Sequence, residues 1–109
     1  MLSNQKRLKM HQTDDIRTIR NLLAAHLPEL KRDFHIQTLE IFGSRVRNEN
    51  HPDSDLDLLV SFSTPPSLTE FIQLKFHLSE LLGLKIDLVM RNALKANIGK
   101  RILQEAIPV

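Results

Sequence analysis

The sequence TLEIFGSRVRNENHPDSDLDLLV, residues 38–60, decides the fold. Apolar side chains alternate with polar ones at both of its ends, and a period of two is typical of a strand with one buried face. Glycine, serine, proline and asparagine are concentrated between these two patterns. We therefore predict strands over 38–42 and 55–62, joined by a polar connection.

The residues before this stretch predict a helix. Apolar side chains recur at helical spacing over 13–26, and Thr13 or Asp14 can cap the first turn. Pro28 is expected to end the helix or to open a short extra turn, because proline lacks the backbone N–H that the helix interior uses.

The residues after this stretch predict two more helices and one strand. Ser67 and Glu70 have the spacing of a capping box, so a helix should run from Ser67 to about residue 82. A third strand is expected over 85–90 and a final helix over 94–106. The apolar stripe of the 67–82 helix is assigned to the core and comprises Leu68, Phe71, Ile72, Leu74, Leu78, Leu81 and Leu82.

The order helix, strand, strand, helix, strand, helix predicts an α/β (α+β) fold. We expect a small mixed sheet with helices packed on one face and an open second face that carries acidic residues. Residues 13–109 should form one domain, and residues 1–12 a basic, frayed tail.

Composition excludes several classes of function. The chain has 109 residues and no cysteine, which rules out disulfides and thiolate chemistry. No apolar run is long enough to span a bilayer and no secretory signal is recognisable, so a cytoplasmic protein is expected. The net charge of +2 gives no argument for nucleic acid as a direct partner.

Three aspartates form the first part of a candidate site. Asp55 and Asp57 are two apart on a predicted strand, so both side chains should leave the same face about 7 Å apart. Ile86 and Leu88 flank Asp87 on the next strand, which predicts Asp87 on that face too. Converging carboxylates are typical of a divalent metal site, and their oxygen ligands favour Mg²⁺, Mn²⁺ or Ca²⁺, as two ions about 4 Å apart.

A glycine-serine bend forms the second part. Gly43 and Ser44 end a predicted strand, where a glycine lets the backbone approach a ligand, and Arg45 and Arg47 supply guanidinium groups for phosphate. Alone, each feature is typical of a turn or a polar strand face; together they indicate a binding site for a nucleoside triphosphate. Elsewhere, Glu40 is expected to pair with a nearby lysine or arginine, and Arg91, which follows the third strand, to be a surface residue, with contact to the substrate as the alternative. These last two are assigned no catalytic role.

The combined motif, Gly43-Ser44 followed after ten residues by Asp55-Leu-Asp57, with Asp87 in Lys-Ile-Asp-Leu-Val, resembles the minimal nucleotidyltransferases of the polymerase-beta-like superfamily. The resemblance covers nearly the whole chain beyond the first dozen residues. It implies that Gly43 and Ser44 hold the triphosphate of ATP and that Asp55 and Asp57 bind magnesium. It also implies that Asp87 helps to deprotonate the acceptor hydroxyl.

The resemblance also implies a partner. Stand-alone members of this size are similar to antitoxins paired with HEPN-domain ribonuclease toxins, and they transfer AMP from ATP to a tyrosine of the toxin. The chain has no tyrosine, so its acceptor would be another molecule. Where the family often has Gly-Ser-x-Ala-Arg-Gly, Val46 and Asn48 depart from the pattern and Arg47 keeps its register. The alternative is a vestigial enzyme that neutralises a toxin by occlusion, and a homo- or hetero-oligomer is open in either case.

Overall fold

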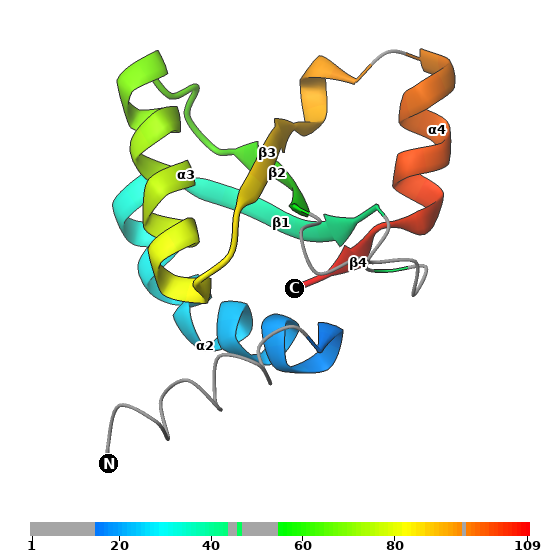
Figure 1. Ribbon diagram of the computed structural model, residues 1–109. Helices are drawn as coiled ribbons and strands as arrows, with labels where there is room; N and C mark the ends of the chain where they lie inside the picture. The colour runs from blue at the N-terminus through cyan, green and yellow to red at the C-terminus, as the bar shows by residue number, and fades with distance from the viewer. Residues whose placement is uncertain (1–14, 44–45, 47–54, 95) are drawn as a thin grey trace.

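The computed structural model describes residues 15–43, 46, 55–94 and 96–109 (Figure 1). The helices are α2 (Ile16–Phe34), α3 (Leu68–Leu82) and α4 (Ala96–Glu105), with a 3-10 turn η1 (Arg91–Ala93). The strands are β1 (Ile36–Phe42), β2 (Leu56–Phe62), β3 (Ile86–Met90) and β4 (Ile107–Pro108). The tail over residues 1–12, with the predicted caps Thr13 and Asp14, lies outside the described residues.

The four strands form one mixed sheet in the order β3-β2-β1-β4. β1 runs antiparallel to both β2 and β4, whereas β2 and β3 are parallel. A parallel pair needs a crossover connection, and α3 supplies it. Figure 1 shows α2 and α3 together on one side, with α4 apart from them beside β4. The predicted α+β class is therefore confirmed.

The core lies between the sheet and the pair α2 and α3. The strand alternation places Leu56, Leu58 and Val60 of β2 fully inside it, and Leu39 and Ile41 of β1 join them. Leu23 of α2 and Leu74 and Leu78 of α3 pack onto this layer without solvent exposure. No helix in the described part of the chain is both long and apolar enough to cross a membrane.

Helix α2 corrects two predictions. It does not end at Pro28 but continues to Phe34 with the proline inside it. The proline costs one backbone hydrogen bond, but the added turns bury Leu30, which is 1 % exposed. Its N-cap is Asp15, whose carboxylate accepts a hydrogen bond from the Arg17 backbone N–H at 3.2 Å.

Only part of the predicted α3 stripe is core. Leu74, Leu78 and Leu82 are buried, whereas Leu68 is 76 % and Ile72 is 41 % exposed. The apolar arc is wider than the side of the helix that meets the sheet, so its outer edge stays in solvent. Phe76, which is 62 % exposed, extends this edge at a spacing of four residues. Leu68, Ile72 and Phe76 are called the α3 outer stripe below.

The predicted capping box at the start of α3 is present. The Ser67 hydroxyl accepts a hydrogen bond from the Glu70 backbone N–H at 3.1 Å, and the Ser67 backbone N–H donates to Glu70 Oε1 at 2.9 Å. This second bond stabilises the carboxylate and holds the pKa of Glu70 below its ordinary value. Gly83 ends the helix in the left-handed conformation, at φ 66°.

Glu70→Gln should lower the melting temperature at pH 7 and have little effect in acid. Because the pKa of Glu70 is lowered in the folded protein, its charge stabilises the fold above the unfolded-state pKa, and this contribution is lost as the pH falls through the folded-state pKa. Thermal melts of both proteins between pH 3 and 7 test this. Glu80→Gln, another exposed α3 acid, is the control. An equal difference at every pH would contradict the prediction.

The second face of the sheet is not fully open, contrary to expectation. Leu59 of β2 points away from the main core cluster and is still 0 % exposed, and Phe42 of β1 is 9 % exposed. Glu40 is the register partner of Leu59 on β1, and η1 contacts β2. The second face is therefore shielded from solvent along the row of paired residues that contains Leu59 and Glu40.

Candidate active site on the second face of the sheet

Asp57 and Asp87 are neighbours across the β2–β3 pair. They are register partners, and the residues that flank them, Leu56 with Ile86 and Leu58 with Leu88, are also partners and are buried. Since side chains alternate along a strand, both carboxylates leave the face opposite the core. Asp57 is half-buried and Asp87 is exposed. The sheet thus places two acids from distant parts of the sequence side by side.

Gly43 brings bare backbone against one of these acids. It follows Phe42, the β1 partner of Asp57, and has φ 91°, a conformation that favours glycine. A Cβ added at Gly43 would lie 2.0 Å from Asp57 Oδ2, so no side chain fits there. The Val46 backbone N–H donates to the Gly43 carbonyl at 3.1 Å and closes the bend.

The other predicted site residues are placed less completely. Asp55 is exposed and immediately precedes β2, so strand alternation does not fix the direction of its side chain. The Leu56 backbone N–H donates to the Lys85 carbonyl at 2.8 Å, which ties the start of β2 to β3 beside Asp55. The predicted phosphate ligands Ser44, Arg45 and Arg47 lie outside the described residues.

The donor chemistry of this face fits Mg²⁺. Magnesium prefers oxygen ligands and is usually held by one or two carboxylates together with substrate phosphates and water. Asp57 and Asp87 supply two such groups, and the Asp57 carboxylate is packed against the Gly43 backbone. Within the described residues no three His, Cys, Asp or Glu side chains form a metal-holding group. A three-aspartate site therefore stays a prediction.

Glu40 and Arg91 form an ion pair on the same face. The Arg91 Nη1 lies 3.4 Å from Glu40 Oε1, which confirms the expectation that Glu40 pairs with a lysine or arginine. The Glu40 side chain is 14 % exposed, although a glutamate on an open face would be expected in solvent. Sequence reasoning left Arg91 as a surface residue. The sequence feature that pointed to a role for Arg91 at the site was its position directly after the strand that carries Asp87.

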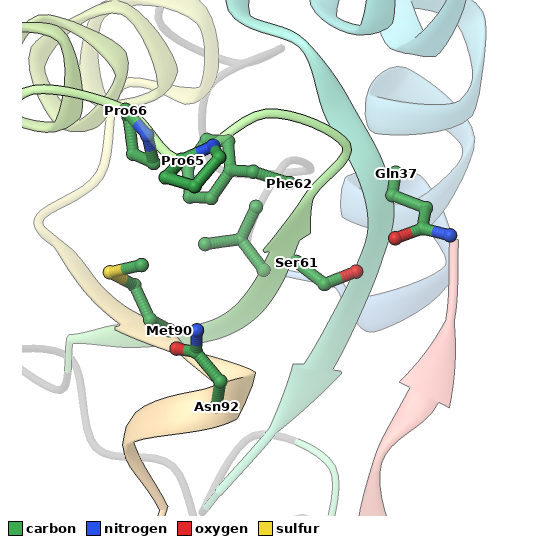
Figure 2. Close-up of a pocket in the computed structure, with 8 residues that line it drawn as sticks. Gln37, Ser61, Phe62, Pro65, Pro66, Met90 and Asn92 are labelled. Atoms are coloured by element: carbon green, nitrogen blue, oxygen red, sulfur yellow. The ribbon is translucent and has the colours of Figure 1, made fainter.

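A separate pocket lies at the far end of β2. It measures about 260 Å³ and is lined by Gln37, Val60, Ser61, Phe62, Pro65, Pro66, Met90 and Asn92 (Figure 2). None of these residues is acidic or basic, so the pocket offers no charged group to a phosphate or a metal. The acidic groups of the candidate site are those of Asp57 and Asp87, which lie outside this pocket.

The chain is similar to known nucleotidyltransferases in sequence and to solved structures in fold. Residues 23–109 match the nucleotidyltransferase domain. The protein adenylyltransferase MntA of Thermococcus cleftensis is 46 % identical over 91 residues, which cover 84 % of this chain and 92 % of that protein. A solved structure of a candidate minimal nucleotidyltransferase superposes with a TM-score of 0.75 at 37 % identity, covering 87 % of this chain and 96 % of that one.

Solved complexes contain the same fold. An MNT antitoxin bound to a tri-AMPylated Shewanella oneidensis HEPN toxin matches with a TM-score of 0.59 at 19 % identity, covering 82 % of this chain and 70 % of that one. A toxin–antitoxin structure with AMP-PNP matches with a TM-score of 0.64 at 21 % identity, covering 77 % and 69 %. At these identities the likeness concerns the fold. From the domain match and the closer relatives, the chain belongs to the nucleotidyltransferase family and, within it, to the minimal nucleotidyltransferases.

Proposed function

We propose that this enzyme transfers AMP from ATP to a hydroxyl of a partner protein, with Mg²⁺ as its cofactor. The observation that carries the proposal is the placement of Asp57 beside Asp87, with the Gly43 bend packed against the Asp57 carboxylate. A carboxylate pair beside an uncovered backbone suits a metal-bound triphosphate, because acids hold the cation and bare backbone can approach phosphate.

Each residue has a distinct proposed role. Asp57, Asp87 and Asp55 would hold Mg²⁺, which when bound neutralises triphosphate charge and favours departure of pyrophosphate. Gly43 keeps side-chain atoms away from the phosphates, and Ser44, Arg45 and Arg47 bind them. Asp87, the more exposed acid of the pair, faces the acceptor and takes the proton of its hydroxyl.

The proposed acceptor is a tyrosine of a HEPN-type ribonuclease toxin, which makes the chain a cytoplasmic antitoxin. The name of the Thermococcus cleftensis relative and the MNT–HEPN complex support this assignment. The chain has no tyrosine of its own to modify. Neutralisation by occlusion is a second candidate, favoured by the α3 outer stripe, an exposed apolar surface of the kind that partners cover.

A transfer assay tests the proposal. The protein is incubated with its cognate HEPN partner, Mg²⁺ and ATP labelled at the α-phosphate, and the partner is analysed for label. We expect label on the partner, its loss with EDTA, and its loss when the acceptor tyrosine is replaced by phenylalanine. An unlabelled partner, under conditions where the nucleotide is bound, would disprove transfer and leave occlusion.

Magnesium and nucleotide together should stabilise the fold. A ligand that binds only the native state at 100 times its Kd adds about 2.7 kcal/mol, and for a domain of this size each kcal/mol raises Tm by about 4–8 °C. We therefore expect saturating AMP-PNP with Mg²⁺ to raise Tm by about 10 °C or more. Melts with Mg²⁺ alone and AMP-PNP alone are the controls. Equal stabilisation by AMP-PNP with and without Mg²⁺ would count against a metal at this face.

A further inference from the structure

The Arg91–Glu40 ion pair bridges three strands across the second face. Arg91 begins η1, directly after β3, whereas Glu40 lies on β1, and β2 lies between those strands. The side chain of Arg91 must therefore pass over β2 to reach Glu40 Oε1 at 3.4 Å. Glu40 is the β1 partner of Leu59, so this path leads to the row of Leu59, which is fully buried.

Burial of the Glu40 carboxylate lowers the stability of the fold, which is not expected of an ion pair with only a structural role. Glu40 Oε1 is shielded from solvent and has no hydrogen-bond partner among the described residues, so its contact with Arg91 is electrostatic. A buried carboxylate oxygen without a hydrogen bond destabilises a protein, and a role in a site is one physical reason for such a group. Arg91 remains 44 % exposed, so part of its side chain is accessible to a ligand.

The row of Glu40 and Leu59 is the next row on the same face after the row of Asp57 and Asp87. Leu59 is two residues beyond Asp57 on β2, so the row crossed by Arg91 is about 7 Å from the row of Asp57 and Asp87. Arg91 and Glu40 also line a pocket of about 360 Å³, whose other residues come from α2, β1 and the C-terminal Pro108 and Val109. Arg91 is therefore accessible at this pocket and lies on the face of the sheet that carries the acids.

We propose that Arg91 binds a phosphate group of the nucleotide and that Glu40 is the residue that positions it. The inference rests on the proposed function, since it assigns a further substrate-binding residue to the same site. Arginine suits this role because its fixed fork of donors matches phosphate oxygens. Glu40 holds the Arg91 guanidinium over the second face of the sheet. Because the guanidinium neutralises the Glu40 carboxylate, Glu40 adds no net negative charge beside Asp57.

Calorimetric titration with AMP-PNP and Mg²⁺ tests the inference through binding. We expect Arg91→Gln to weaken binding about 10- to 100-fold, the loss of one charge-assisted contact to phosphate. Glu40→Gln should weaken it less, because the guanidinium is kept but loses its anchor. Arg91→Lys should recover part of the affinity, since the charge returns without the fork.

A double variant separates contact from structure. Glu40→Gln combined with Arg91→Gln removes both charges and leaves no buried unpaired carboxylate, so its melting temperature should remain near that of the wild type. If its affinity falls as far as that of Arg91→Gln, the guanidinium acts on the nucleotide. Wild-type affinity in the double variant would overturn the inference, because the pair would then be structural only.

The salt dependence gives an independent readout. Wild-type affinity should fall more steeply with NaCl concentration than that of Arg91→Gln, because a phosphate contact has been removed from the variant. Equal slopes would also overturn the role of Arg91. If the wild type itself fails to bind AMP-PNP with Mg²⁺, the proposed function fails together with this inference, whereas unchanged affinity in Arg91→Gln removes this inference alone.

Discussion

Asp57→Asn is expected to abolish AMP transfer, with a loss of about 1,000-fold or more, because it removes charge where the reaction needs it. Asparagine has nearly the size of aspartate, and Asp57 points away from the main core cluster, so the variant should fold. The neutral amide oxygen is a weaker ligand for a divalent cation than a carboxylate, so the variant should bind the cation beside Asp87 less tightly. The rate of labelling of the partner, measured with a thermal melt of each protein, checks both expectations.

The control for this variant is Asp33→Asn, the same chemical change at an exposed α2 acid paired with Arg32. It should transfer AMP at the wild-type rate. A folded Asp57→Asn protein that keeps a tenth of the activity would remove Asp57 from the catalytic set. If the variant is inactive in vitro and still protects cells from the toxin as the wild type does, occlusion is the means of neutralisation.

Gly43→Ala is expected to reduce both activity and stability. Alanine disfavours φ 91°, at a cost of about 1–2 kcal/mol, and its methyl group would overlap Asp57 Oδ2. The carboxylate or the bend must shift, and a displacement near 1 Å in a catalytic group lowers the rate about 100-fold. Denaturant unfolding and the transfer assay measure the two effects.

A double-mutant cycle separates the two causes at Gly43. In an Asp57→Ala background the overlapping oxygen is absent, so Gly43→Ala should destabilise the protein less than it does in the wild type, by about 0.5–3 kcal/mol. Gly83→Ala is the control for the backbone, since Gly83 also has a positive φ, 66°, but ends α3 away from the acids. It should lose stability and keep its rate. Additive effects of the Gly43 and Asp57 substitutions would show that the two residues do not interact.

Structural features that depend on neighbouring residues were predicted from the sequence better than features that depend on contacts between distant segments. The Ser67 capping box and the alternation that buries Leu56 and Leu58 depend on near neighbours, and both are present. The continuation of α2 past Pro28 depends on the burial of Leu30 against other elements. β4 was not predicted, because two residues that include a proline carry no strand pattern and pair only through β1.

The candidate site was predictable to the extent that strand alternation controls it. Alternation alone predicts that Asp57 and Asp87 leave the same face, and the register adds that they are direct partners. The coverage of Leu59 and the ion pair of Glu40 with Arg91 depend on the order of the strands in the sheet, which the sequence pattern does not contain. The roles of Ser44, Arg45 and Arg47 rest on the motif.

The parallel register of β2 with β3 decides on which face of the sheet Asp87 lies, and there is no intermediate position between the two faces. Side chains alternate along β3, so a slip of one residue would turn Asp87 towards α3 and carry Ile86 and Leu88 out to water. The two buried apolar neighbours, Ile86 and Leu88, thereby fix the direction in which Asp87 points. Inserting or deleting one residue in the short connection after α3 should therefore leave a protein that either restores the alignment or fails to fold, with few intermediate states.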